Sequence, residues 1–381
     1  MPTVSDSCPV CGPEWRPPSN GTDRRWPPRS GPVGKDSEMR AVVMRDRRLV
    51  VDEVPEPVPG PGQVLVETIA CGICGSDKQA LDHTDAFLRA SRDSGVPTFL
   101  FDPHRDLVMG HELAARVIGA GPDTPYTEGQ AVVALPWALD AAGGIHGVGY
   151  SNDFPGGYGE RMVLQAMALE PIPEHVPPRV AALTEPLAVG FGNVARTGIG
   201  PEGTGIVIGC GPVGLGAVAA LAERGAAPIV ASDPSPLRRA AALRLGAHRV
   251  IDPAAEDPVD VWRELAAPGQ QLHVWVCAAV PGLLNDLLYR CPRETRILQV
   301  GAVMTDDVIR PIVGIYKDIS VQMCMVYPHE EYARTLRRIA EGTVDAASLI
   351  TDEVGFDGVA GAIEALRRPD DHIQILVRPD L

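Results

Sequence analysis

The chain has 381 residues, which is long for one domain and comfortable for two, and 45% of them are hydrophobic, as in a soluble globular protein. The formal net charge of −15 argues against nucleic acid and anionic membranes as partners, because both would repel an acidic surface. No apolar signal segment and no membrane-spanning run is evident, so we expect a cytoplasmic protein. Its eight cysteines are then expected to be reduced thiols, available for metal ligation.

Residues 1–38 differ from the rest of the chain. Pro, Gly, Ser and Arg dominate this segment and hydrophobic periodicity is absent, so we expect a disordered extension. Met39 begins a well-patterned strand and is a candidate for the true start. Cys8 and Cys11 form a C-x-x-C pair that could supply half of a zinc site, but we interpret them as two thiols in a loose tail.

Residues 39–190 contain short strands with period-two alternation, separated by turn residues, which predicts a β-rich domain. The expected elements are a hairpin over 40–51, strands over 63–70 and 113–118, a helical piece over 85–91, and short strands and turns over 129–190.

From about Phe191 short apolar strands alternate with helices, which predicts a parallel, doubly wound sheet and hence an α/β protein. A last strand at 373–377 is expected to return to the first domain. The first domain therefore comprises residues 39–190 and 331–381, and the second comprises 191–330. The six strands of the second domain are expected at 206–208, 229–232, 249–251, 274–276, 297–300 and 319–323, and two later helices at 332–341 and 359–367.

A glycine cluster after the strand at 206–208 matches the G-x-G-x-x-G pattern of dinucleotide-binding turns. The first glycine permits a sharp turn, the second lets the backbone approach a pyrophosphate, and the third lets the helix pack on the strand. The start of the following helix favours phosphates. The expected cofactor-binding residues in this turn are Gly209, Gly211, Pro212, Val213 and Gly214.

Asp233 ends the next strand, nineteen residues after Gly214, where an acid can bind the hydroxyls of the adenosine ribose. Its charge favours NAD and would repel the 2′-phosphate of NADP. Arg238 and Arg239 follow closely; they could flank the adenine, accept a phosphate, or form a solvated helix face. Gly301, after the strand at 297–300, is expected beside the nicotinamide.

Cys74 and His111 are zinc-type ligands, and a catalytic zinc needs three protein ligands and one open position. Glu185 is the first candidate for the third ligand and Glu112 the second. Taken alone, His111 could be a structural histidine and Cys74 a buried small residue.

Four motifs occur in one order: Cys-Gly-Ile-Cys-Gly-Ser-Asp over 71–77, Gly-His-Glu over 110–112, Thr-Glu-Pro-Leu over 184–187 and Gly-Cys-Gly-Pro-Val-Gly over 209–214. From Met39 to its end, the chain resembles the zinc-dependent medium-chain dehydrogenase/reductase family of alcohol and polyol dehydrogenases. The resemblance implies a GroES-like catalytic domain carrying zinc, a Rossmann domain binding NAD, and an active site in the cleft between them. It also implies homodimers or homotetramers.

The resemblance implies that Cys74 and His111 ligate zinc. Ser76 would contact the substrate oxygen and start a proton relay, and Asp77 would orient His111. Glu185 stands where polyol-type members have a carboxylate. The implied activity is hydride transfer between NAD(H) and an alcohol or ketone, with a secondary alcohol or polyol favoured.

The sequence departs from the family pattern at three points. Residues 130–158 contain no cysteine, so we expect one catalytic zinc per chain and no structural zinc. Gln79 occupies the usual position of a relay histidine; either His83 substitutes, or the proton leaves through water and ribose hydroxyls. Residues 84–105 form an enlarged segment that could shape substrate choice at the cleft mouth or serve in packing or oligomerisation.

Two rival functions agree less well with these residues. A zinc-free quinone or enoyl reductase of the same superfamily would lack the Cys and His ligands that are present here. A non-catalytic dinucleotide-binding protein would have no use for Cys74, Ser76, Asp77 and His111 together.

Overall fold

The computed structural model describes residues 37–121, 124–325, 327–368 and 371–381. The extension predicted over residues 1–38 therefore lies outside the described residues except for Ser37 and Glu38, and so do Cys8 and Cys11. No helix of the described part of the chain is long and apolar enough to cross a membrane.

The first described element is the predicted hairpin. Strands β1 (Glu38–Arg45) and β2 (Arg48–Pro55) pair antiparallel, with Val43 opposite Val50. Asp46 and Arg47 form the two-residue turn and both have positive φ, which matches the twist of the strands. Strand β4 (Leu107–Val108) completes this sheet beside β1.

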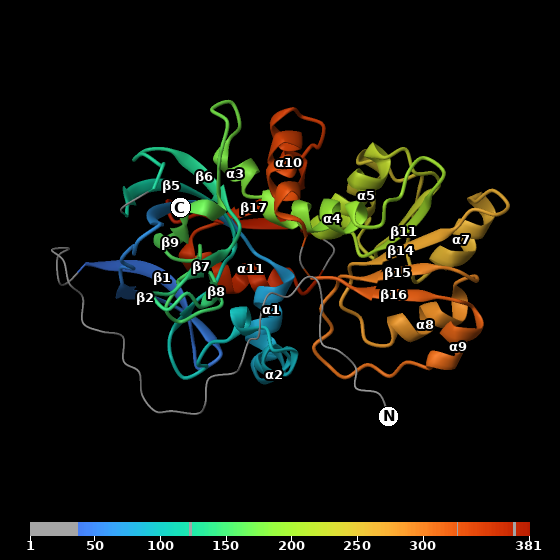
Figure 1. Cartoon of the computed structure of the whole chain (residues 1–381), viewed down its shortest axis with the longest axis horizontal. Coiled ribbons are helices and arrows are strands. Elements are labelled where there is room, and N and C mark those ends of the chain that lie inside the picture. The colour runs from blue at the N-terminus through green and yellow to red at the C-terminus, as the bar shows by residue number, and fades with distance from the viewer. Residues whose placement is uncertain (1–36, 122–123, 326, 369–370) are drawn as a thin grey trace, which may run out of the picture. The chain divides into compact units, whose positions relative to one another are not determined.

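A seven-stranded sheet forms the framework of the first domain (Figure 1). The C-terminal strand β18 pairs with β3, with Val377 opposite Cys71, so the end of the chain lies next to the segment that leads to Cys74. The strands of this sheet are β3 (Gln63–Gly72), β5 (Glu112–Ala120), β6 (Ala131–Ala134), β9 (Arg161–Gln165), β10 (Leu169–Pro171), β17 (Ile350–Val354) and β18 (Gln374–Val377). A separate two-stranded sheet joins β7 (Trp137–Leu139) and β8 (Ile145–Gly147).

The expectation of only strands and turns over 129–190 is wrong in its last part, where α3 (Pro178–Ala181) and α4 (Thr184–Ala195) form. The glycines of α4 suggest turns in the sequence, but in the fold they allow close helix packing. A Cβ on Gly190 would lie 2.3 Å from the carbonyl oxygen of Val213, and one on Gly192 would lie 2.3 Å from Cβ of Tyr327. The contact of Gly190 brings α4 directly against the helix that follows the glycine turn, which we define as residues 209–214.

The remaining helices of the first domain are α1 (Gly75–Asp82), α2 (Thr84–Ser94), α10 (His329–Ala340) and α11 (Val359–Ala365). Both expected domain boundaries fall inside helices, at 190/191 in α4 and at 330/331 in α10. The four short 3-10 helices are η1 (Pro97–Phe99), η2 (Ala166–Ala168), η3 (Ala347–Leu349) and η4 (Phe356–Gly358).

The predicted doubly wound sheet is confirmed: six parallel strands lie in the order β13-β12-β11-β14-β15-β16. This is the strand order of dinucleotide-binding Rossmann folds. The strands are β11 (Thr204–Ile208), β12 (Ile229–Ser232), β13 (Arg249–Ile251), β14 (Leu272–Val276), β15 (Arg296–Gln299) and β16 (Ser320–Met323). The helices are α5 (Pro212–Glu223), α6 (Pro236–Arg244), α7 (Pro258–Leu265), α8 (Leu283–Arg290) and α9 (Pro311–Tyr316).

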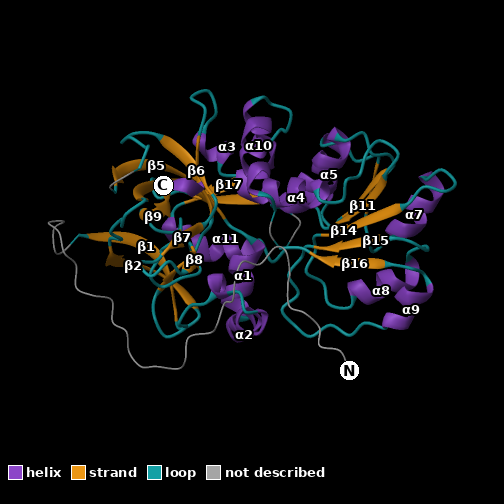
Figure 2. Ribbon diagram, viewed as in Figure 1, coloured by secondary structure: helices purple, strands orange, loops and turns teal. Residues whose placement is uncertain are grey.

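Helices cover both faces of this sheet, and Figure 2 shows α5 on one side of the strands with α8 and α9 on the other. Alternate residues of β11 enter different hydrophobic clusters: Val207 packs with residues of α5, whereas Ile206 and Ile208 pack with residues of α7 and α8. The central strands β11, β12 and β14 are therefore buried on both sides, which explains their short, nearly continuous apolar runs.

Candidate active site

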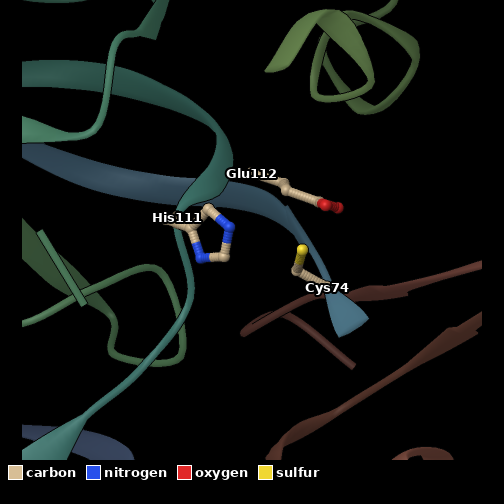
Figure 3. A group of neighbouring side chains, drawn as sticks. All are labelled: Cys74, His111 and Glu112. Carbon is tan, nitrogen blue, oxygen red and sulfur yellow. The ribbon is translucent and has the colours of Figure 1, made fainter. Parts of the chain in front are cut away.

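Cys74, His111 and Glu112 converge in the first domain, and one ligand-type atom from each lies within 4.8 Å of the others (Figure 3). The strand register explains the convergence. Strands β3 and β5 are antiparallel neighbours with Gly72 opposite Glu112, so the chain leaving β3 reaches Cys74 beside the residues that enter β5. Among the described residues this is the one group of three Cys, His, Asp or Glu side chains with metal-holding spacing.

In the metal-free site, burial disfavours the charged forms of Cys74 and Glu112, whereas Asp77 and Cys74 raise the pKa of His111 well above its ordinary value although burial opposes them. Burial raises the pKa of the Cys74 thiol to about 11, and the neighbouring Glu112 adds to the effect. Burial likewise raises the pKa of Glu112 to about 7. Sulfur, imidazole and carboxylate donors in one compact group suit Zn²⁺, and three protein ligands leave a fourth position for substrate. The residues present therefore fit a catalytic zinc.

Glu112 is held in place by a residue from the far end of the chain. Its Oε2 accepts a hydrogen bond of 2.6 Å from Nε2 of Gln374, which begins β18. Gly72 makes room for this pair, because a Cβ there would lie 2.2 Å from both atoms. Sequence patterns did not indicate Gln374.

Glu185, the first candidate for the third ligand, lies outside the group of three. It is 8% exposed in the first turn of α4, and its Oε1 accepts a hydrogen bond of 3.3 Å from the Tyr327 hydroxyl. Burial raises the pKa of Glu185, and its charge in turn contributes to the raised pKa of Glu112. The geometry thus favours Glu112 as third ligand and places Glu185 as a second carboxylate nearby.

Asp77 is fully buried and forms the link between His111 and the chain around it. Oδ2 accepts hydrogen bonds from the Cys74 amide at 3.0 Å and the Tyr158 hydroxyl at 2.8 Å. Oδ1 lies 3.4 Å from Nδ1 of His111. Although burial opposes it, the charge of His111 and these donors lower the pKa of Asp77. Because Nδ1 of His111 faces Asp77, Nε2 is the ring nitrogen left for a metal.

Ser76 lies in the first turn of α1, half-buried, with Oγ 3.1 Å from Sγ of Cys74. The Tyr150 hydroxyl lies 2.8 Å from Oγ of Ser76 and 2.9 Å from Oδ1 of Asp77. Burial, together with the charge of Asp77, raises the pKa of Tyr150 well above its ordinary value. Tyr150 was not among the predicted site residues; its position depends on the packing of a distant turn, which no local pattern reveals.

His83 is exposed at the junction of α1 and α2. Within the described ranges no hydrogen bond connects its side chain to Ser76, Asp77 or Tyr150. The segment after His83 is not an open loop: Phe87 and Phe101 are buried, and Phe87 and Phe99 each place their ring centroid 5.4 Å from that of Tyr150. Of the two interpretations of residues 84–105, the contacts favour packing.

The glycine turn lies at the carboxyl end of β11. Its glycines differ in whether a side chain would have room. Gly209 has φ of +92°, and a Cβ on Gly214 would lie 1.8 Å from the carbonyl oxygen of Gly209. A Cβ on Gly211 would meet nothing within 4 Å. Pro212 and Val213 then begin α5. Gly209 and Gly214 therefore maintain the turn, whereas Gly211 leaves its surface open to a ligand.

Asp233 lies beside the glycine turn, immediately after β12. It is 3% exposed, and its two carboxylate oxygens accept hydrogen bonds from the amides of Cys210 at 2.7 Å and Ser235 at 2.8 Å. Arg238 donates from Nε to the carbonyl oxygen of His372 at 3.0 Å, and Arg239 donates to the carbonyl oxygen of Asp233 at 2.7 Å. Both guanidinium groups thus have acceptors within the protein.

Gly301 follows β15 at the same edge of the sheet. Its amide donates to the carbonyl oxygen of Val276 at 2.8 Å, and a Cβ there would lie 2.5 Å from the carbonyl oxygen of Ala278. Ala278 also approaches Gly209, so Gly209 and Gly301 flank one backbone segment. A cavity of about 440 Å³ lies at the opposite, amino-terminal ends of these strands, lined in part by Gly203, His273 and Arg296, and is not part of this edge.

Comparison with known proteins matches two family models to the chain: an alcohol dehydrogenase GroES-like domain over residues 60–174 and a zinc-binding dehydrogenase domain over residues 212–341. A probable diacetyl reductase [(R)-acetoin forming] of Saccharomyces cerevisiae is 27% identical, covering 86% of this chain and 87% of that protein. Sorbitol dehydrogenase of Bacillus subtilis is 25% identical, covering 90% and 98%.

The crystal structure of 2R,3R-butanediol dehydrogenase from Bacillus subtilis matches with a TM-score of 0.74 and 25% identity. The match covers 90% of this chain and 99% of that one. The two domain models together span most of the described chain. The first covers most of the seven-stranded sheet and the second covers most of the six-stranded parallel sheet. The chain therefore belongs to the zinc-dependent medium-chain dehydrogenase/reductase family.

Proposed function

We propose that the protein is a zinc-dependent oxidoreductase that transfers a hydride between NAD(H) and an alcohol or ketone. The observation that carries the proposal is the convergence of Cys74, His111 and Glu112, with Ser76 beside Cys74. Similarity to proteins named for diacetyl, sorbitol and butanediol supports a secondary alcohol or polyol as substrate. The rival zinc-free reductase and the non-catalytic binding protein gain no support from any of these findings.

Each residue of the site has a separate proposed role. Cys74, His111 and Glu112 would hold the metal, and Asp77 fixes the ring of His111. When bound, zinc lowers the pKa of a substrate hydroxyl or polarises a carbonyl, and the nicotinamide supplies the redox capacity. Ser76 would accept the proton released by the substrate hydroxyl and pass its own hydroxyl proton on, so that the serine stays neutral.

We propose one catalytic zinc per chain and no structural zinc, which the absence of cysteine from residues 130–158 supports. We also assign residues 39–190 and 331–381 to the catalytic domain and 191–330 to the nucleotide domain, with α4 and α10 shared at the boundaries. A cytoplasmic location is supported by the cysteines of the described chain, all of which are free, as is usual in a reducing compartment.

The test of the proposed function is a screen of secondary alcohols, polyols and their ketones on zinc-loaded enzyme, with NAD and NADP side by side. We expect formation of the reduced cofactor from at least one secondary alcohol or polyol, with NAD preferred. Tight NAD binding without turnover on any alcohol or ketone would instead support a binding protein.

For the cofactor, Asp233→Ala is expected to weaken NAD at least about tenfold and to raise the relative use of NADP. The carboxylate is fixed beside the glycine turn, where it can bind ribose hydroxyls and repel a 2′-phosphate. The ratio of kcat/KM for the two cofactors measures this effect. Asp252→Ala, which removes an acidic partner of Arg239 at 3.3 Å, is the control and should leave the ratio near that of the wild type. An unchanged ratio in Asp233→Ala would remove Asp233 from this role.

We propose that the enzyme is a homo-oligomer whose contact includes the edge of the nucleotide-domain sheet. Strand β16 is one of the two edge strands of this sheet among the described residues, and all four of its residues are exposed, including Val321 and Met323. Ile315 and Tyr316, at the end of the preceding helix, are 65% and 73% exposed. An unpaired apolar strand edge favours pairing with a second copy. A monomeric mass in light scattering at working concentration would contradict this proposal.

A further inference from the structure

We infer that Tyr150 is a positioning residue that orients the Ser76 hydroxyl to receive the substrate's proton. The inference rests on the role proposed above for Ser76 and extends it to a residue that no sequence motif indicated. Gln79 stands at the usual position of a relay histidine, so the residue that contacts Ser76 on its buried side is of interest. That residue is Tyr150.

The two hydrogen bonds of the Tyr150 hydroxyl determine which way the Ser76 hydroxyl donates. Tyr150 Oη lies 2.9 Å from Oδ1 of Asp77 and 2.8 Å from Oγ of Ser76. An ionised carboxylate can only accept, so the single proton of Tyr150 points to Asp77. The lone pairs of Oη then face Ser76, which donates its own proton to them.

A serine whose proton is held on the buried side presents its lone pairs elsewhere. Sγ of Cys74, at 3.1 Å from Oγ, is the other possible acceptor of the serine proton, but Oη of Tyr150 lies closer, and in the zinc-loaded enzyme the sulfur would be a ligand of the metal. With Tyr150 in place, Ser76 can therefore accept a hydrogen bond from an incoming substrate hydroxyl, which is what a proton acceptor requires. As the substrate's proton reaches Oγ, the serine's own proton moves to Oη of Tyr150 and that of Tyr150 moves to Oδ1 of Asp77, so the serine stays neutral.

The structure holds Tyr150 rigidly. Its side chain is 2% exposed, and its ring packs against Phe87 and Phe99, with centroids 5.4 Å away, and against His111 at 5.2 Å. The turn before it is equally constrained: a Cβ on Gly149 would lie 2.8 Å from the carbonyl oxygen of Gly110. The segment over 84–105 thus acts on the site through Tyr150, because its aromatic side chains fix the ring.

Tyr158 offers a matched control within the same network. Its hydroxyl lies 2.8 Å from Oδ2 of Asp77, and like Tyr150 it is buried, but it makes no hydrogen bond to Ser76 among the described contacts. Tyr158→Phe therefore removes one hydrogen bond from Asp77 without touching the serine, whereas Tyr150→Phe removes one from each.

The experiment is a double-mutant cycle on the full chain loaded with zinc. Ser76→Ala, Tyr150→Phe, Tyr158→Phe and both double variants that contain Ser76→Ala are compared for kcat, zinc content and NAD affinity, at a temperature where thermal unfolding shows every variant folded. We expect Tyr150→Phe to lower kcat about 10- to 100-fold with zinc content and NAD affinity unchanged, as for the loss of a group that orients a proton acceptor.

In the Ser76→Ala background, adding Tyr150→Phe should lower kcat little further, because the serine that Tyr150 orients is gone. Any effect of Tyr158→Phe on kcat should persist in that background. Multiplying effects of Tyr150→Phe and Ser76→Ala, or loss of zinc from Tyr150→Phe, would overturn the inference while leaving the proposed function intact. Full activity of Ser76→Ala alone would instead refute the role of the serine, and with it that of Tyr150.

Discussion

Cys74→Ser and His111→Ala are each expected to lower alcohol oxidation at least about 10³-fold and to reduce the zinc content of the purified chain. The loss corresponds to about 4 kcal/mol of transition-state stabilisation, which is within the range of a metal ion acting on a reacting oxygen. The fold should survive, because Cys74 lies half-buried at the start of α1 and truncating the buried ring of His111 costs about 3–5 kcal/mol, which is less than the free energy of unfolding of most domains. Metal analysis and kcat/KM measure the two effects.

Cys71→Ala is the control for this pair. Cys71 lies three residues before Cys74 and is fully buried in β3, yet it is not among the three converging side chains. The variant should keep its zinc and its turnover. Wild-type turnover in metal-depleted Cys74→Ser would refute the zinc mechanism, and loss of zinc from Cys71→Ala would mean that the ligand set is wrong.

Gly211→Val and Gly214→Ala are expected to fail in different ways. The valine side chain would fill the space that is open at Gly211, so the dissociation constant for NAD should rise at least about 30-fold, or about 2 kcal/mol, with thermal stability retained. In Gly214→Ala the new Cβ would lie 1.8 Å from the Gly209 carbonyl, so the turn must shift and the unfolding midpoint should fall by several degrees.

Fluorescence titration with NAD and thermal unfolding distinguish the two outcomes. Gly361→Ala in α11, at a position where a Cβ also meets nothing within 4 Å and φ is not positive, is a control for NAD affinity. Wild-type NAD affinity in Gly211→Val would show that the cofactor does not pass over this glycine.

The central strands of the parallel sheet, β11, β12 and β14, could be predicted closely from the sequence because they are buried on both faces and read as short apolar runs. Strand β17, Ile-Thr-Asp-Glu-Val, was missed because its residues are only partly buried and carry no apolar run. Helix α4 was missed because Gly190 and Gly192 resemble turn signals. Their actual cause is the close packing of α4, which depends on residues that the sequence does not place nearby.

In the site, too, features set by local motifs could be predicted, and features set by contacts between distant segments could not. Cys74 and His111 could be predicted because ligand-type residues stand in short motifs, and register between two strands brings them together. Gln374 could not be predicted, since it lies 262 residues from the Glu112 that it holds. The sequence alone ranked Glu185 above Glu112 as third ligand; only the position of each carboxylate relative to Cys74 and His111 separates them. The contacts of Tyr150 with Ser76 and of Tyr327 with Glu185 likewise join distant segments.

Stepwise addition of zinc to the metal-free enzyme, followed by calorimetry and by NADH formation at pH 8 and pH 6, tests the zinc mechanism most directly. Binding requires deprotonated ligands, and in the metal-free site the pKa of Cys74 is about 11 and that of Glu112 about 7. Each zinc must therefore displace a proton from Cys74 at both pH values, one from His111, whose pKa is raised well above its ordinary value, and a further one from Glu112 below pH 7. Affinity should therefore be weaker at pH 6 by more than about tenfold per pH unit. We expect heat and turnover to saturate together at one zinc per chain; full turnover before any zinc is added would contradict the account.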